Sequence, residues 1–333
     1  MPEAPGLKIA LKRGALVAGA NWPLVAVQFI ADSTLKVLLA VPVLGGIFLV
    51  ALLLDADVEL LLAGDIRDVV GTILAALREN PAALTFFLGA FLIVLLGGSA
   101  LTFAVKAGTV AVLVDAEAAA GAIERPPLRL QALRRANRAG IEPFLEGCRR
   151  LWSRYLKLGA CLLVVYGATA AVYLGLLIQG YAAADNIGVL LGWTLAAAGA
   201  SSVLLVWITL VNFFYLLTQM VMAVDDVGVR TAVVRVVRFL RSSLPEVAGV
   251  FGVVFVLVIL ATIASILGTA GLGLISFVPV AALLALPLQV AAWLLRGFVF
   301  QYLALTALGA YLTQYRLHLH DAPMGADRGH RLA

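Results

Sequence analysis

Long runs without a charged residue constrain this chain more than any other feature. Residues 247–267, VAGVFGVVFVLVILATIASIL, form one such run, and residues 156–177 are interrupted only by Lys157. About 20 consecutive apolar residues are what a helix needs to cross ~30 Å of hydrocarbon. The alternation of polar and apolar residues that is typical of a membrane β-barrel is absent from the sequence. We therefore predict an all-α, polytopic membrane protein.

The composition supports this class, because 63% of the residues are hydrophobic and only 13% are charged. Soluble domains average roughly half apolar and a quarter charged residues. We predict six transmembrane helices arranged as three hairpins, within one domain that covers residues 33–315. The predicted spans are residues 33–54, 83–105, 157–179, 189–211, 247–268 and 275–296.

The basic residues predict the orientation of the spans. They are concentrated in the N-terminal segment 1–32, in the second and fourth connections and in a polar tail, 316–333, whereas the odd-numbered connections hold only Arg67 and Arg78. By the positive-inside rule, both termini and the even-numbered connections are cytosolic, as in a bacterial inner-membrane protein. The net charge of +5 is then a topology signal that requires no nucleic-acid partner. The stretch before Ala18-Gly19-Ala20 is too short for a cleaved signal peptide, so we expect it to be retained.

The connections are predicted to form short amphipathic helices. One lies in the outer connection, residues 55–82, and others lie in the cytosolic connections at about 116–156 and 225–245. Basic amphipathic helices lie in the headgroup plane and attract anionic lipid. An alternative is that their arginines only determine topology. The candidate lipid-surface residues are Arg149, Arg150, Arg154, Arg235, Arg238 and Arg241.

The second helix of each hairpin is predicted to be longer than the membrane is thick. Apolar sequence continues to Val114, Val224 and about Tyr315. A helix over 83–114 would be ~48 Å long, against ~30 Å of hydrocarbon. We expect these helices to project into the cytosol and to pack on one another.

Two cations on these long helices are the main candidates for a ligand site. Arg296 stands in the apolar stretch LQVAAWLLRGFVFQYLALTAL, and Lys106 takes a similar place earlier in the chain. Both could face a cavity and bind a phosphate or carboxylate headgroup, or each could extend into the cytosolic headgroups. Asn212, Tyr215 and Gln219 share one helical face and either line the same cavity or form hydrogen bonds between helices.

Other polar residues have local explanations. Asp32 and Lys36 are spaced i, i+4 in the order that favours a pair within one helix. The alternative is a buried ion pair of Asp32 with Arg296 or Lys106 on another span. The histidines lie in the polar tail, and no metal or cofactor motif is present. Catalytic motifs are also absent, so a membrane enzyme would have to use Asp115, Asp225 or Asp226.

The ends of two long helices resemble one another and suggest a family. AVLVDAEAAAGA (111–122) and MVMAVDDVGVRTA (220–232) both place Val-Asp at the predicted cytosolic end. With the segment VDDVGVRTAVVRVVRFLR (224–241), the chain resembles bacterial six-span proteins similar to the membrane domain attached to some glycerophosphodiester phosphodiesterases. Asp225, Asp226 and Gly228 would fill that class's acidic and glycine positions. The resemblance implies a fold class, and it does not imply phosphodiesterase activity, because the soluble catalytic domain is absent.

Three functions fit these observations. The first is a non-enzymatic protein that binds, or helps to move, an anionic lipid or amphiphile through a cytosol-facing cavity. The second is a structural subunit whose projecting helices dock a partner protein or a second copy. The third is a membrane enzyme acting on lipid phosphates, which would need carboxylates that converge on Arg296.

Overall fold

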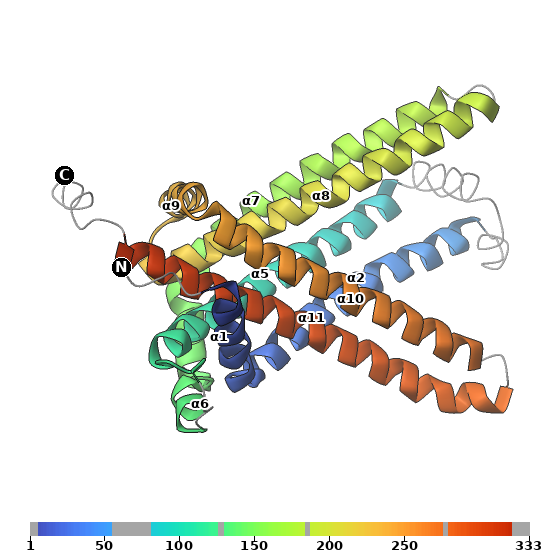
Figure 1. The fold of residues 1–333 in the computed structure, drawn as a ribbon. Helices are drawn as coiled ribbons and strands as arrows, with labels where there is room; N and C mark the ends of the chain where they lie inside the picture. The colour runs from blue at the N-terminus through green and yellow to red at the C-terminus, as the bar shows by residue number, and fades with distance from the viewer. Residues whose placement is uncertain (1–5, 55–80, 126–129, 184–186, 276–278, 322–333) are drawn as a thin grey trace. The chain divides into compact units, whose positions relative to one another are not determined.

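The structure is a computed structural model that describes residues 6–54, 81–125, 130–183, 187–275 and 279–321. Throughout these ranges the regular secondary structure is helical, with no strand (Figure 1). The helices are α1 (Leu7–Ala20), α2 (Trp22–Leu54), α5 (Pro81–Ala119), α6 (Leu130–Ala136), α7 (Ile141–Ala182), α8 (Ile187–Asp225), α9 (Val229–Ser242), α10 (Leu244–Ile275) and α11 (Pro279–Asp321).

Six of these helices are long and apolar enough to cross a membrane, which confirms the predicted class and the number of candidate spans. They are α2, α5, α7, α8, α10 and α11. Two begin with proline, Pro81 in α5 and Pro279 in α11, where the missing N–H is not needed. Pro42 and Pro287 lie inside α2 and α11, and membrane helices tolerate interior proline better than soluble ones.

The long second helices are present as single elements. Helix α5 has 39 residues, α8 has 39 and α11 has 43, so each runs well beyond one membrane thickness. Other boundaries differ from those predicted. Helix α2 begins at Trp22 rather than near 33, and α11 runs from Pro279 through the first residues of the predicted tail. The predicted outer helix at 55–82 lies almost entirely outside the described residues.

The chain divides into two compact units, with the boundaries inside α2 and α5. The smaller unit holds residues 27–105. Within it, a Cβ added to Gly98 of α5 would overlap the side chain of Leu35 on α2. The pair predicted from sequence is present there, because Lys36 Nζ lies 2.6 Å from Asp32 Oδ2.

The larger unit, residues 1–26 and 106–333, has its core at one end of its long helices. We call this region the packed end. Most of its buried side chains come from α1, the last part of α5, the first part of α7, the last parts of α8 and α11, and α9, and others come from the first turns of α2 and α10 and from α6. The remaining lengths of α7, α8 and α10 have largely exposed apolar surfaces, which suits helices that face lipid. Buried members of the packed end include Val17, Leu113, Leu151, Tyr155, Leu217, Met220, Val236, Phe239, Leu305, Tyr311 and Tyr315.

Glycines allow two close helix crossings in the packed end. Where α1 crosses α11, a Cβ on Gly14 would overlap the carbonyl oxygen of Thr306 and lie 2.7 Å from the Ala310 nitrogen. Where α5 crosses α7, a Cβ on Gly108 would lie 2.6 Å from Cys148 Sγ. Small residues at such crossings let the backbones approach closely, as is common between membrane helices.

Helix α9 places its apolar face inside the protein. Ala232, Val236 and Phe239 are buried, and the ring of Phe239 packs edge-on against Tyr315 of α11 at 5.2 Å between centroids. The amphipathic pattern of this segment is therefore satisfied by the packed end, while Arg238 and Arg241 remain exposed.

Candidate functional site

Arg296 lines a groove between α10 and α11. The groove has a volume of about 270 Å³, and small residues of α10 form one wall: Ala261, Ala264, Ser265, Gly268 and Thr269. Arg296 is exposed, and its guanidinium carbon lies 5.6 Å from the centroid of the Phe300 ring one turn further along α11. Among the described residues no acidic side chain forms an ion pair with Arg296. The converging carboxylates that a membrane enzyme would need at Arg296 are thus absent from the described part of the chain.

Lys106 lies at a different place, where the buried part of α5 begins. Its Nζ is 5.3 Å from the centroid of the Tyr215 ring on α8, which is a cation–π contact. Tyr215 and Gln219 are both buried, and the backbone carbonyl of Gln219 accepts a hydrogen bond of 2.9 Å from the Tyr155 hydroxyl of α7. The structure therefore brings Lys106 to Tyr215, while Arg296 lines its own groove.

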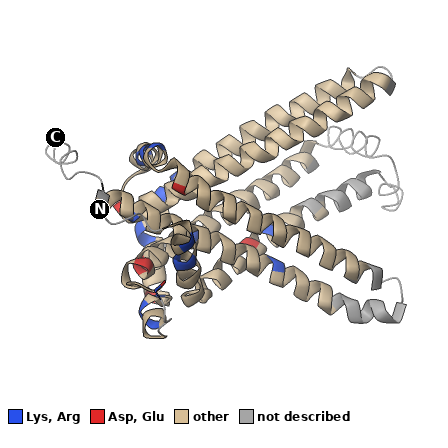
Figure 2. Cartoon of the chain, in the orientation of Figure 1, with Lys and Arg blue, Asp and Glu red and all other residues tan. Residues whose placement is uncertain are grey.

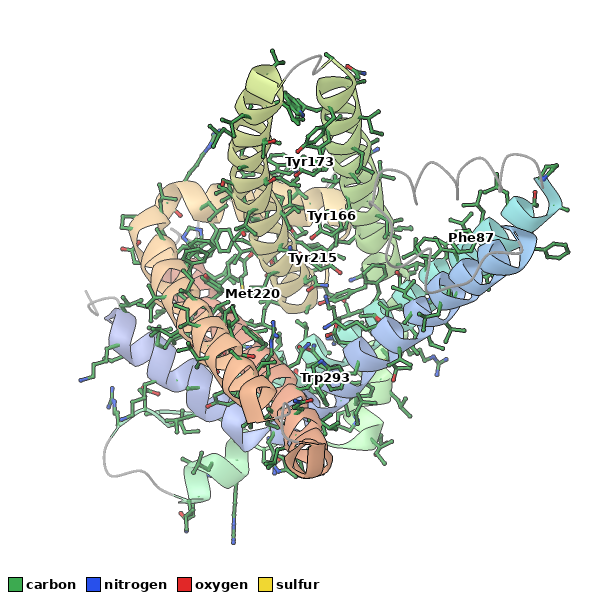
Figure 3. All side chains as sticks on the ribbon, turned by 90° about the vertical axis from the view of Figure 1, so that its right-hand side faces the viewer. Phe87, Tyr166, Tyr173, Tyr215, Met220 and Trp293 are labelled. Carbon is green, nitrogen blue, oxygen red and sulfur yellow. The ribbon has the colours of Figure 1, made fainter. Side chains whose placement is uncertain are left out.

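Asn212 belongs to a series of hydrogen bonds between α7 and α8. Its Oδ1 accepts a bond of 2.6 Å from the Tyr166 hydroxyl. Trp207 Nε1 donates to Thr169 Oγ1 at 3.1 Å, and the hydroxyls of Tyr173 and Ser201 lie 2.6 Å apart. Figure 3 shows Tyr173, Tyr166 and Tyr215 one after another along these two helices. These bonds join the helices as interhelical polar contacts commonly do.

The six predicted lipid-surface arginines separate into two groups. Two of them form ion pairs at the end of α8: Arg235 Nη1 lies 2.6 Å from Oδ2 of Asp225, the last residue of the helix, and Arg154 Nη1 lies 2.7 Å from Oδ1 of Asp226, the next residue. Asp225 also accepts a hydrogen bond of 2.6 Å from the Tyr315 hydroxyl. The other four arginines are exposed: Arg149, Arg150, Arg238 and Arg241.

Sequence reasoning did not single out a second ionic cluster, centred on Glu117 of α5. Its carboxylate is almost fully buried and lies between two arginines, with Arg13 Nε 2.9 Å from Oε1 and Arg316 Nη1 2.8 Å from Oε2. Arg13 also pairs with Glu124 at 2.9 Å. Arg316 Nη2 donates to the carbonyl of Val114 at 2.9 Å. The sequence shows these charged residues far apart along the chain, in α1 and near the ends of α5 and α11, and it does not indicate which of them form pairs.

The ion pairs of the larger unit lie where its charged residues gather. Figure 2 shows charged residues gathered around α1, α6, α9 and the adjoining ends of α7, α8 and α11, whereas most of the length of α7, α8 and α10 carries none. The ionic contacts thus tie α1, α5, α7, α8, α9 and α11 together within the packed end.

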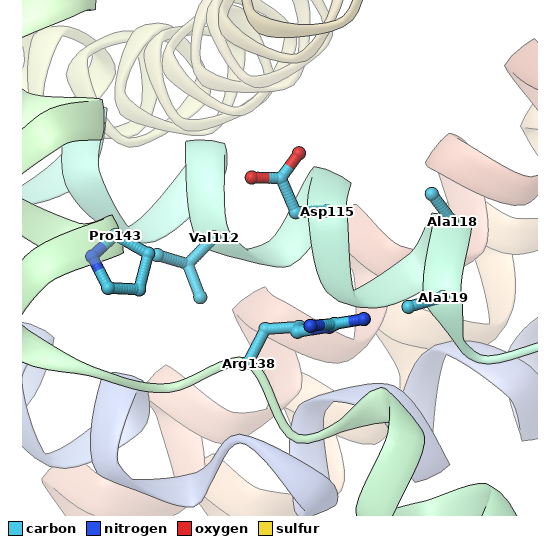
Figure 4. Close-up of a pocket in the computed structure, with 6 residues that line it drawn as sticks. All are labelled: Val112, Asp115, Ala118, Ala119, Arg138 and Pro143. Atoms are coloured by element: carbon cyan, nitrogen blue, oxygen red, sulfur yellow. The ribbon is translucent and has the colours of Figure 1, made fainter.

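A second cavity, of about 520 Å³, opens beside the last turns of α5 (Figure 4). We call it the α5 cleft. Val112, Ala118 and Ala119 of α5 form one side and Pro143 of α7 lies at its edge. Two charged residues also line it, Asp115 of α5 and Arg138 of the segment between α6 and α7.

Among the described residues, no group of three His, Cys, Asp or Glu side chains gathers where it could hold a metal ion. His318 and His320 belong to the last turns of α11 rather than to a tail, and His318 Nδ1 lies 3.2 Å from the Ser242 hydroxyl of α9. His330 lies outside the described residues.

No protein-family model, no curated protein and no solved structure matches this chain. The resemblance to the phosphodiesterase-associated membrane domain therefore stays a prediction. What the structure adds is that Asp225 and Asp226 are partners of Arg235 and Arg154.

Proposed function

We propose that this chain is a multi-pass protein of the bacterial inner membrane that binds an anionic lipid or amphiphile at Arg296. In this proposal three hairpins cross the bilayer, and the packed end and both termini lie in the cytosol. The positive-inside rule supports that orientation, because the basic residues of the connections gather at the packed end. The protein acts without catalysis, by holding the lipid or by helping it to move.

The observation that carries the proposal is an exposed guanidinium that has no acidic partner among the described residues and lies on the wall of an apolar groove. Arg296 is nine residues before Leu305, where the buried part of α11 begins, which is ~14 Å along a helix. A charged side chain at membrane depth is costly unless an opposite charge or water accompanies it. A lipid phosphate can supply that charge through paired hydrogen bonds, and the small residues of α10 leave room for part of an acyl chain.

The α10 wall of the groove carries hydroxyl groups and no charged side chain. Thr269 Oγ1 donates to the Ser265 carbonyl at 2.8 Å, so this hydroxyl is engaged within its own helix. The alternative is that Arg296 only extends toward the headgroups and binds nothing specifically.

Native mass spectrometry from nanodiscs of phosphatidylglycerol and phosphatidylcholine distinguishes specific lipid binding at Arg296 from simple extension of its side chain toward the headgroups. Wild type is expected to retain phosphatidylglycerol, and Arg296→Ala to lose it by about tenfold or more, because a charge-assisted contact is removed. Arg296→Lys keeps the charge but not the paired donors, so it should fall between. Arg134→Ala, which removes an exposed arginine of α6 outside the groove, is the matched control and should behave as wild type. Equal retention by wild type and Arg296→Ala would refute the proposal.

A second candidate, docking of a partner protein, is favoured by one other observation. Ile141, Leu145, Trp152 and Leu156 share a face of α7 and are all exposed, with Ile141 at 81%. Exposed apolar stripes of this kind mark interaction surfaces. Replacing Leu145 and Trp152 with serine should abolish co-purification of a partner or self-association if this face docks protein, and should change neither if it faces lipid.

A further inference from the structure

We propose that the α5 cleft binds a small zwitterion that carries an ammonium group together with a phosphate or carboxylate group. The proposal rests on Asp115, Arg138 and the cleft between them. It is independent of Arg296, which lines a different groove.

The size and lining of the cleft suit a small polar molecule. Its volume of about 520 Å³ falls within the ~300–1,000 Å³ typical of small-molecule sites. Such sites combine apolar walls with a few placed polar groups. Here the walls are Val112, Ala118, Ala119 and Pro143, and the two alanines leave space that longer side chains would fill.

The charges of the cleft are complementary to a zwitterion. A guanidinium presents paired donors to a phosphate or carboxylate, and a carboxylate accepts hydrogen bonds from an ammonium group. In the view of Figure 4 the Asp115 carboxylate lies above α5 and the Arg138 side chain lies below it. Within the described part of the chain neither forms an ion pair, whereas the nearby acids Glu117 and Glu124 are both paired.

The backbone that carries Arg138 is held in place by a buried side chain. Asn21, between α1 and α2, is fully buried. Its Oδ1 accepts a bond of 2.8 Å from the Arg138 backbone nitrogen, and its Nδ2 donates to the Ala136 carbonyl at 2.8 Å. The segment is thus fixed on both sides of Asn137. Preorganisation of this kind lowers the entropy lost on binding.

Binding of phosphoethanolamine and of glycine to the full-length protein, in nanodiscs of phosphatidylcholine, tests this site by isothermal calorimetry. We expect at least one of the two to bind saturably. Inorganic phosphate and ethanolamine, which each carry half of the charge pattern, should bind about tenfold more weakly or worse, because one charge-assisted contact is missing.

Three variants locate the site. Arg138→Gln and Asp115→Asn should each weaken binding by about tenfold. Ala118→Trp keeps both charges but fills the cleft, so it should abolish binding. Arg134→Gln on α6 removes an exposed arginine that does not line the cleft, and it should bind as wild type. Thermal unfolding of each variant confirms that the protein is folded.

The source of the zwitterion is decided by repeating the titration in nanodiscs that contain phosphatidylethanolamine. Weaker binding of free phosphoethanolamine there means that the lipid headgroup competes for the cleft, and unchanged binding means that the ligand is a soluble molecule. The proposal fails if neither probe binds saturably. It also fails if Asp115→Asn binds as tightly as wild type, since the site would then recognise an anion alone, or if Arg138→Gln does so.

Discussion

The ends of α5 and α8 carry the same Val-Asp pair and use it differently. In α8, Asp225 has a side chain only 8% exposed, and it binds Arg235 and the Tyr315 hydroxyl. In α5, Asp115 is exposed at the edge of the α5 cleft, and the buried ionic role falls two residues later, to Glu117. A shared local sequence therefore does not determine which carboxylate is structural.

The difference arises from α11, which contacts both α5 and α8 through two consecutive residues. Tyr315 bonds Asp225 of α8, and Arg316 pairs with Glu117 of α5. Successive residues of a helix point about 100° apart, so they reach different neighbours. The carboxylate that meets α11 becomes buried and paired, and one on another face stays available for a ligand.

The largest effect is expected from Glu117→Ala, which would break the cluster at α5. Arg316 would lose its carboxylate partner, and Arg13, whose side chain is 13% exposed, would keep only its pair with Glu124. Removing one member of a buried ionic group costs about 3–5 kcal/mol, because the remaining charges are uncompensated. The free energy of unfolding in mixed micelles measures this loss. Glu142→Ala, at an exposed acid in the first turn of α7, is the control. A cost as small as that of the control would show that Glu117 does not hold α5 in place.

The corresponding change at α8, Asp225→Ala, should cost less. It removes one ion pair with the partly exposed Arg235 and one hydrogen bond from Tyr315, and a bond to a charged group is worth about 1.5–3 kcal/mol. The same unfolding measurement applies. Asp226→Asn is the matched control, because its pair with Arg154 is exposed and worth about 0–1 kcal/mol. Asparagine also tolerates the left-handed backbone of Asp226, with φ of 53°. Equal losses in the two variants would contradict the distinction between Asp225 and Asp226.

Gly14→Ala tests the crossing that brings α1, and with it Arg13, to α5. Its Cβ would meet the backbone of α11, which cannot yield as a flexible side chain does. We expect a loss of about 1–3 kcal/mol, as for overpacking. Gly19→Ala on the same helix is the control, since its nearest neighbour, the Tyr302 hydroxyl, would be 3.8 Å away. If the melting temperatures of the two variants coincide, α1 does not cross α11 at Gly14.

The smallest effect on stability should come from Asp115→Asn. An exposed side chain without an ion pair among the described residues contributes within about 0.5 kcal/mol, so the unfolding free energy should match that of wild type. The same variant should lose zwitterion binding, which separates a ligand role from a structural one. A loss of stability similar to that of Asp225→Ala would show that Asp115 is as important to the fold as Asp225, and it would contradict the distinction between the two Val-Asp pairs.

The sequence predicted those features that depend on nearby residues. The helical membrane class and the six candidate spans followed from runs of apolar residues, and the Asp32–Lys36 pair followed from spacing on one helix. The excess length of α5, α8 and α11 followed from where apolar sequence stops. Span ends were less predictable, as α2 shows, because polar residues such as Asn21 can be buried when they bond backbone groups.

Only the tertiary structure decided which charges meet. Arg13 and Glu117 are separated by 104 residues, and Asn21 and Arg138 by 117. The transfer of apolar side chains out of water determines which segments form long helices and roughly how long these helices are. This free energy can be read from the sequence, because it depends on the residues of each segment alone. The partner of a charge depends instead on the rotation and register of helices across a crossing such as that of Gly14 and Gly309. That geometry makes Glu117 and Asp225 structural, and it leaves Arg296, Asp115 and Arg138 facing cavities.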